Sequence, residues 1–140
     1  MTNKIVVNWK EDMLFESVAK EGSVLIEASE DVGGKGRGLR PKAMMLSALA
    51  GCTAMDVASL LKKMRAEVAD FRIEAEAHLT DEHPKYYDKV KVTYYFYDKA
   101  FKKDKIEKAI NLSIDRYCGV MEMFRKFSEV TTEIHYIEQS

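Results

Sequence analysis

The sequence predicts an α+β domain in which antiparallel sheets surround a long buried helix. Three observations predict it: short segments rich in β-forming residues before residue 30, one long apolar segment at residues 43–61, and strand-like alternation followed by helical spacing after residue 70. The expected order of elements is βββαββααβ, with the helices packed on one face of antiparallel sheet. A length of 140 residues suits one domain over residues 1–140.

The first three segments are predicted strands. KIVVNW (4–9), LFESVA (14–19) and SVLIEA (23–28) are rich in β-forming residues, and turn-type residues separate them. This spacing indicates a meander.

The apolar segment AMMLSALAGCTAMDVASLL is close in length to a membrane span, but polar and small residues interrupt it. We therefore expect a helix over residues 41–65 that is the buried centre of a domain or a dimer, not a membrane helix. Pro41 suits its first turn, and Lys62, Lys63 and Arg65 suit its C-terminal end. Small residues such as Ser47 and Gly51 on this helix would allow a partner helix to approach closely.

The remaining elements follow from periodicity. Apolar and polar residues alternate over residues 71–79 and 90–96, and the turn between them contains Pro84, so a long antiparallel hairpin is predicted. Helical spacing of apolar residues predicts an amphipathic helix at 103–117 that ends at Cys118, then a short helix at 119–127. The segment EVTTEIHYIE alternates again and predicts a closing strand.

Charge and cysteine content limit the functional classes. Twenty-two basic against 23 acidic residues give a net charge of −1, which does not favour nucleic acid or an anionic membrane as a partner. The N-terminal residues contain no apolar run typical of a signal peptide, so a cytoplasmic protein is expected. In that compartment Cys52 and Cys118 would be free thiols or a transient catalytic pair.

The residues alone leave two interpretations of the cysteines open. Cysteines buried among apolar residues are inert, whereas a reactive thiolate needs a nearby cation or a helix N-terminus. The candidate cations lie in the glycine-rich segment DVGGKGRGLRPK, which the glycines would allow to fold back over the helix; they are Lys35, Arg37, Arg40 and Lys42. A phosphate-binding loop is the weaker interpretation of this segment because it has no GxxxxGK[ST] motif. The three histidines lack the paired spacing of metal ligands.

Two segments, RPKAMMLSALAGCTAMDVASLL and DRYCGVMEMFRK, resemble the OsmC/Ohr family of osmotically inducible protein C and organic hydroperoxide resistance proteins, in its OsmC-like branch. The first is similar to the family's central helix with its first cysteine, and the second to the helix that carries the other cysteine. The resemblance spans nearly the whole chain. It implies an intertwined homodimer with sheets around two central helices and active sites at the subunit interface.

The resemblance also implies a role in the oxidative stress response, with an antioxidant peroxidase reaction. Cys52 would attack an organic hydroperoxide and become a sulfenic acid, Cys118 would resolve it as a disulfide, and a dithiol of lipoyl or similar type would reduce the pair. No metal, flavin or other cofactor is implied. The family's arginine, which stabilises the thiolate, would be Arg37 here, with Arg40 as the second candidate.

The sequence departs from the family at the start of the central helix. The family places there a glutamate that orients the arginine, and this chain has Lys42 and Ala43 instead. An alternative function is therefore a dimeric redox sensor or a binding protein for a small apolar ligand, with little turnover. A structural dimer with inert thiols is a third possibility.

Overall fold

The computed structural model describes residues 1–140, which form two compact units, Met1–Met45 and Leu46–Ser140. The main elements follow the predicted order βββαββααβ. A 3-10 turn, Glu30–Val32, and a π turn, Ser113–Tyr117, are additional. The α+β class predicted from the sequence is thus confirmed, with two three-stranded sheets.

The first unit contains the predicted meander. Strands β1 (Val6–Glu11), β2 (Leu14–Ala19) and β3 (Gly22–Glu27) pair antiparallel in the order β1-β2-β3. Two side chains of this sheet, those of Leu14 and Glu27, are buried. A buried carboxylate in so small a unit requires a partner.

The glycine-rich segment after β3 folds back onto β3. The amide of Leu39 donates to the carbonyl of Leu25 at 2.9 Å, and the amide of Glu27 donates to the carbonyl of Leu39 at 2.9 Å. A Cβ atom on Gly34 would lie 1.8 Å from the carbonyl oxygen of Ala28, so only glycine permits this approach. The glycines were expected to fold the loop over the helix; they bring it against β3.

Helix α1 spans Pro41–Lys63, two residues less than predicted. Arg65 has a φ of 55°, and the amides of Arg65 and Ala66 donate to the carbonyls of Lys62 and Leu61, which is the Schellman arrangement that ends a helix. By length and composition alone α1 would be long and apolar enough to cross a membrane. Its buried residues recur every four positions and face the core of the second unit; they are Leu49, Thr53, Val57 and Leu61.

The second sheet has β5 in its centre. Strands β4 (Asp70–Leu79) and β5 (Tyr87–Asp98) form the predicted antiparallel hairpin, whereas β6 (Glu129–Glu138) pairs parallel to β5 from Lys89 onwards. The expectation of purely antiparallel sheets is therefore wrong for this strand. The helical segments after β5 return the chain to the end at which β5 begins, and such a crossover makes the next strand parallel.

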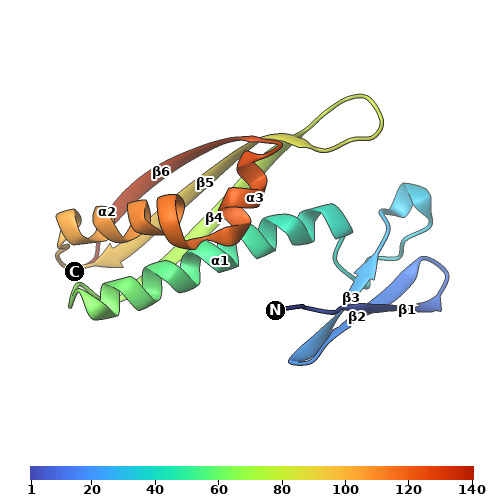
Figure 1. Ribbon diagram of the computed structural model, residues 1–140, viewed down its shortest axis with the longest axis horizontal. Coiled ribbons are helices and arrows are strands. Elements are labelled where there is room, and N and C mark those ends of the chain that lie inside the picture. The colour runs from blue at the N-terminus through green and yellow to red at the C-terminus, as the bar shows by residue number, and fades with distance from the viewer. The chain divides into compact units, whose positions relative to one another are not determined.

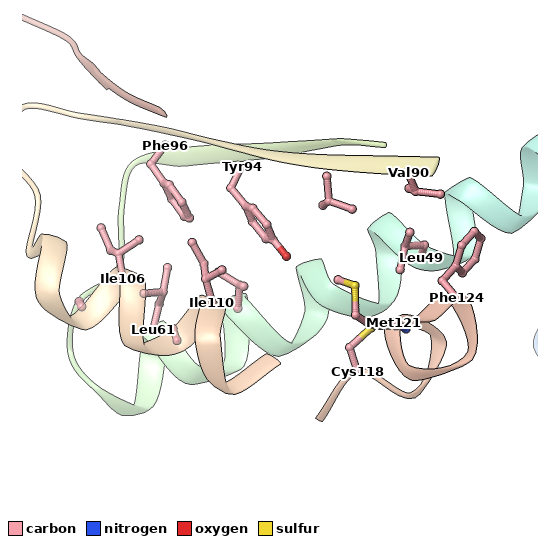
Figure 2. Close-up of a cluster of buried hydrophobic side chains, with 14 of the residues drawn as sticks. Leu49, Leu61, Val90, Tyr94, Phe96, Ile106, Ile110, Cys118, Met121 and Phe124 are labelled. Atoms are coloured by element: carbon pink, nitrogen blue, oxygen red, sulfur yellow. Dashed lines mark hydrogen bonds between the residues drawn. The ribbon is translucent and has the colours of Figure 1, made fainter. Parts of the chain in front are cut away.

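The core lies between this sheet and the helices. Helices α1, α2 (Lys103–Leu112) and α3 (Gly119–Arg125) lie on one face of the sheet (Figure 1). Figure 2 shows the aromatic rings of Tyr94 and Phe96 directed from β5 towards Ile106 and Ile110 of α2. The fully buried members come from every layer; they include Leu49, Val57, Val92, Tyr94, Phe96, Ile106, Ile110 and Met121.

The helix predicted for residues 103–117 is divided in the structure. Helix α2 ends at Leu112, and the π turn Ser113–Tyr117 follows, in which the amide of Cys118 donates to the carbonyl of Ser113 at 2.8 Å. A π turn is wider than an α-helical turn and often occurs at functional sites. Here it places Ser113 and Cys118 at the junction between α2 and α3.

Candidate functional site

Cys52 lies in the middle of α1, on the flank of its buried stripe. Its side chain is partly buried and packs against the core, and it is a free thiol. Thr53 is next to it in the stripe, and Asp56 follows Cys52 by one helical turn, so that Cys52 and Asp56 share a face of the helix.

Cys118 is the N-cap residue of α3 and is also a free thiol. It is 4% exposed, and its Sγ accepts a hydrogen bond from the amide of Met121 at 3.3 Å. Figure 2 shows it with Met121 at the base of α3. Burial, together with the neighbouring Cys52 thiol and the charge of Asp56, raises the pKa of Cys118 to about 12, although the Met121 amide acts in the opposite direction.

The two cysteines, which are far apart in sequence, meet in the second unit. The sulfur atoms of Cys52 and Cys118 and a carboxylate oxygen of Asp56 all lie within 4.8 Å of one another. The fold therefore brings together the two cysteines that the sequence analysis selected. It adds Asp56, which the sequence showed only as an interruption of an apolar helix.

A chain of buried hydroxyl groups leads from this cluster into the core. Ser113 Oγ donates to Asp56 Oδ2 at 2.9 Å, and Thr53 Oγ1 lies 2.8 Å from both Ser113 Oγ and Tyr94 Oη. Thr53, Ser113 and Tyr94 have no exposed surface. We call these four residues the Asp56 network.

The pKa of Tyr94, the tyrosine of the Asp56 network, is shifted as well. Burial raises the pKa of Tyr94 to about 12, and the charge of Asp56 acts in the same direction, while the hydrogen bond with Thr53 acts against it. Tyr94 is therefore a neutral hydroxyl at physiological pH. A fully hydrogen-bonded buried network of this kind fixes the positions of its members.

Arg37, the arginine that the resemblance selects, lies in the first unit and is bound by Glu27. Its Nη2 and Nε lie 2.6 and 3.1 Å from Glu27 Oε2, and its amide donates to Glu27 Oε1 at 2.7 Å. Glu27 also accepts the amide of Lys35 at 3.0 Å. Glu11 and Asp12 are longer ion-pair partners of Arg37, at 3.9 and 3.7 Å.

These contacts change the pKa of Glu27, and they identify Glu27 as the carboxylate that orients Arg37. The side-chain hydrogen bond from Arg37 lowers the pKa of Glu27 to about 2, despite burial of this 1% exposed residue. The start of the central helix offers Arg37 no carboxylate, because Lys42 and Ala43 stand there. The carboxylate comes from Glu27 at the end of β3, a strand whose other residues are exposed or half-buried.

The other candidate cations are less confined. Arg40 and Lys42 are exposed, and Lys35 pairs with Asp12 at 3.1 Å on the surface. An exposed ion pair contributes about 0–1 kcal/mol to folding stability. Arg37 is thus the candidate whose guanidinium is held in one orientation by several bonds.

The comparisons with known proteins agree with this fold. The model of the family described as OsmC-like protein matches residues 34–133. Protein YhfA of Escherichia coli K12 is 26% identical over 125 residues, which cover 89% of this chain and 91% of YhfA. Residues 34–133 are well over half of the chain, so the match identifies the family and not only a motif.

Solved structures show the same architecture. A hypothetical protein from Aquifex aeolicus VF5 has a TM-score of 0.87 at 23% identity and covers 100% of this chain and 99% of its own. The organic hydroperoxide resistance protein OhrB of Bacillus subtilis has a TM-score of 0.63 at 17% identity, with 96% and 98% covered. At such identities these likenesses establish the fold alone. Sequence and fold together lead to one conclusion: the chain belongs to the OsmC-like protein family.

Proposed function

We propose that this chain is a thiol-dependent peroxidase that reduces organic hydroperoxides at Cys52. The observation that carries the proposal is the approach of two free thiols, Cys52 and Cys118, to within 4.8 Å from separate elements. Membership of the OsmC-like family suggests a peroxide-resistance or redox role. One structural neighbour is named as an organic hydroperoxide resistance protein.

The surroundings of the two thiols favour different roles for them. The raised pKa of Cys118 keeps that buried thiol protonated at neutral pH, and a protonated thiol is a poor nucleophile. Cys52 is only partly buried, so a substrate reaches it more easily. We therefore assign the attack on peroxide to Cys52 and the resolving step to Cys118.

The proposed reaction is balanced without a bound cofactor. The Cys52 thiolate attacks the O–O bond of the hydroperoxide; the sulfur becomes a sulfenic acid, and the other oxygen leaves as an alcohol after taking up a proton. The Cys118 thiol then attacks the sulfenic sulfur, forming a disulfide and water. An external dithiol reduces this disulfide by thiol exchange and is itself oxidised to a disulfide.

Asp56 suits the resolving step because Cys118 must lose its proton when it attacks. A carboxylate oxygen of Asp56 lies within 4.8 Å of that sulfur, and Ser113 orients the carboxylate through Oδ2. Arg37 remains the proposed cation for the Cys52 thiolate on the basis of the family resemblance. Glu27 holds its guanidinium in one orientation.

We also propose that the chain forms a homodimer and acts in a reducing compartment such as the cytoplasm. Only 22% of the apolar 18-residue stretch of α1 is buried within a single chain. A second copy of this chain would cover such a helix, and cytoplasmic reductants would keep both thiols reduced.

A peroxidase assay on the full-length reduced protein tests the function. Cumene hydroperoxide is the substrate, dihydrolipoamide the reductant, and peroxide consumption the measured quantity. Cys52→Ser should abolish turnover, and Cys118→Ser should stop after one equivalent with a sulfenic acid that dimedone traps. Ser59→Ala, an exposed residue on α1, is the matched control. Unchanged consumption by Cys52→Ser would overturn the mechanism.

A redox sensor with slow turnover is the second candidate. Burial of Cys118 favours it, because a confined thiol of raised pKa would hinder both resolution and reduction. The original reason for this candidate, an Arg37 without a carboxylate, no longer applies because Glu27 supplies one. Stoichiometric oxidation of Cys52 without multiple turnover in the same assay would favour the sensor.

A further inference from the structure

We propose that Cys52, Asp56 and Cys118 form a binding site for a thiophilic divalent cation of the Zn²⁺ class, available only while both thiols are reduced. Two sulfurs and one carboxylate oxygen are donors that Zn²⁺ accepts, and three protein ligands leave the fourth position open to water. Thiolate ligands also select against Mg²⁺ and Ca²⁺, which prefer oxygen.

The geometry of the three side chains is close to what a tetrahedral ion needs. Zn–S bonds of about 2.3 Å at the tetrahedral angle place two sulfurs about 3.8 Å apart. The donor atoms here all lie within 4.8 Å of one another, so the two sulfurs need to approach by about 1 Å at most. Small rotations of the side-chain torsions supply such a movement.

The ligands come from two elements that the fold holds rigidly. Cys52 and Asp56 are four positions apart on α1, the spacing at which helices present paired ligands to one ion. Cys118 approaches from the junction between the π turn and α3, and its amide is bound to Ser113. The site is therefore assembled by the second unit alone.

A second layer of hydrogen bonds orients the ligands. Ser113 donates to Asp56 Oδ2 at 2.9 Å, Thr53 bonds Ser113 from the buried side, and Tyr94 in turn bonds Thr53. The amide of Met121 donates to Cys118 Sγ and favours its charged form. Outer partners of this kind are typical of metal sites, and losing one costs about 10- to 100-fold in affinity.

A bound cation would offset the negative charge of Cys52, Asp56 and Cys118. A buried pair of thiolates beside a carboxylate repels itself, and a divalent cation offsets most of that charge, so binding displaces the thiol protons. Affinity should therefore rise with pH. The metal-bound sulfurs would react more slowly with peroxide than free thiolates do, because each shares one lone pair with the ion.

Oxidation would release the ion. When a hydroperoxide oxidises the metal dithiolate, the two sulfurs lose two electrons and form a disulfide, while the O–O bond accepts these electrons and two protons to give alcohol and water. A disulfide carries no charge and is a poor ligand, so the divalent cation dissociates. Binding itself requires no peroxidase turnover and stands independently of the proposed function.

The test is a metal titration of the reduced, full-length protein without oxygen or peroxide. Co²⁺ should produce a thiolate-to-cobalt charge-transfer band and the visible bands of a tetrahedral ion, and Zn²⁺ should remove them at one equivalent per chain. Absence of the charge-transfer band would overturn the proposal, as would an unchanged band after diamide oxidation.

Variants assign the ligands. Cys52→Ser, Cys118→Ser and Asp56→Asn should each weaken Zn²⁺ binding at least about tenfold, measured by competition with a chromophoric chelator, and Ser113→Ala should act in the same direction through Asp56. Asp115→Asn, an exposed carboxylate on the π turn, is the matched control. Equal affinity of Asp56→Asn and wild type would remove Asp56 from the site. Binding by a protein without peroxidase turnover would leave this proposal standing and the proposed function refuted.

Discussion

The carboxylate of Glu27 accepts hydrogen bonds from both the guanidinium and the backbone amide of Arg37, with an Nη2–Oε2 distance of 2.6 Å and an amide–Oε1 distance of 2.7 Å. Two elements cooperate in this pair, because β3 ends at Glu27 and the glycine-rich segment folds back to present Arg37. The guanidinium is thus fixed in orientation by a residue outside the central helix.

The first prediction concerns acid stability. The pKa of Glu27 is lowered from 4.5 to about 2, mainly by its hydrogen bond from Arg37. A lowered pKa stabilises the fold above the unfolded value, and this contribution is lost as pH falls from about 4.5 through about 2. Glu27→Gln should therefore show a weaker decrease of stability over this range than wild type, measured by urea unfolding at each pH.

The same variant connects Glu27 to the proposed reaction. With the carboxylate removed, Arg37 loses its orienting partner, so kcat/KM for cumene hydroperoxide should fall about tenfold or more, because a misplaced catalytic group costs on the order of 100-fold in rate. Glu30→Gln, an exposed neighbour in the 3-10 turn, should match wild type in both measurements. Equal acid profiles for Glu27→Gln and wild type would contradict the assignment.

The second prediction is a difference in alkylation rate between the thiols. Because the pKa of Cys118 is raised to about 12 and the residue is buried, iodoacetamide should label Cys52 well before Cys118 in the native protein at pH 8. Peptide mass spectrometry measures both rates, with unfolded protein as the reference. Faster labelling of Cys118 than of Cys52 would reverse the proposed roles.

Asp56 provides a matched change for this measurement. Its charge helps to raise the pKa of Cys118, so Asp56→Asn should lower that pKa and accelerate labelling of Cys118. The resolving step should nevertheless slow, because the proton acceptor is lost. If Asp56→Asn accelerated both labelling of Cys118 and disulfide formation, Asp56 would not be the proton acceptor. If it slowed both, the charge of Asp56 would not raise the pKa of Cys118.

The third prediction concerns the Asp56 network. Thr53→Val leaves the hydroxyls of Tyr94 and Ser113 without their shared partner, and a buried unsatisfied polar group costs about 1–3 kcal/mol. The free energy of unfolding from urea denaturation should decrease by this amount. Thr131→Val, an exposed residue on β6, is the control. The double variant Thr53→Val/Ser113→Ala should lose less unfolding free energy than the two single variants together. Additive losses would indicate that Thr53 and Ser113 do not share a hydrogen bond.

Periodicity and turn residues were sufficient to predict the order of elements and most of their bounds. They did not reveal that β6 is parallel, because alternation fixes which face a residue occupies and not the direction of its partner strand. The π turn was also missed, since its residues continue the helical spacing of α2.

The cysteines of the site were predictable because cysteine is rare in this chain. The charged residues of the site were not, because their roles depend on contacts with other elements. Cys52 and Cys118 were selected from the sequence, and the structure places them together. Asp56 and Glu27 were not, because each looks like an ordinary charge until its partner from another element is known. In both cases the available signal was a charged residue between two apolar chain neighbours.

The fourth prediction tests the proposed homodimer. Met55 on α1 is 74% exposed within one chain, which is unusual for a large apolar side chain on a helix of this composition. If a second copy covers α1, Met55→Asp buries a charge without a partner and should weaken association by several kcal/mol. Sedimentation velocity should show a dimer for wild type and a monomer for Met55→Asp at micromolar concentration. Leu79→Asp, at the end of β4 and 37% exposed, should remain dimeric, and a monomeric wild type would refute the dimer.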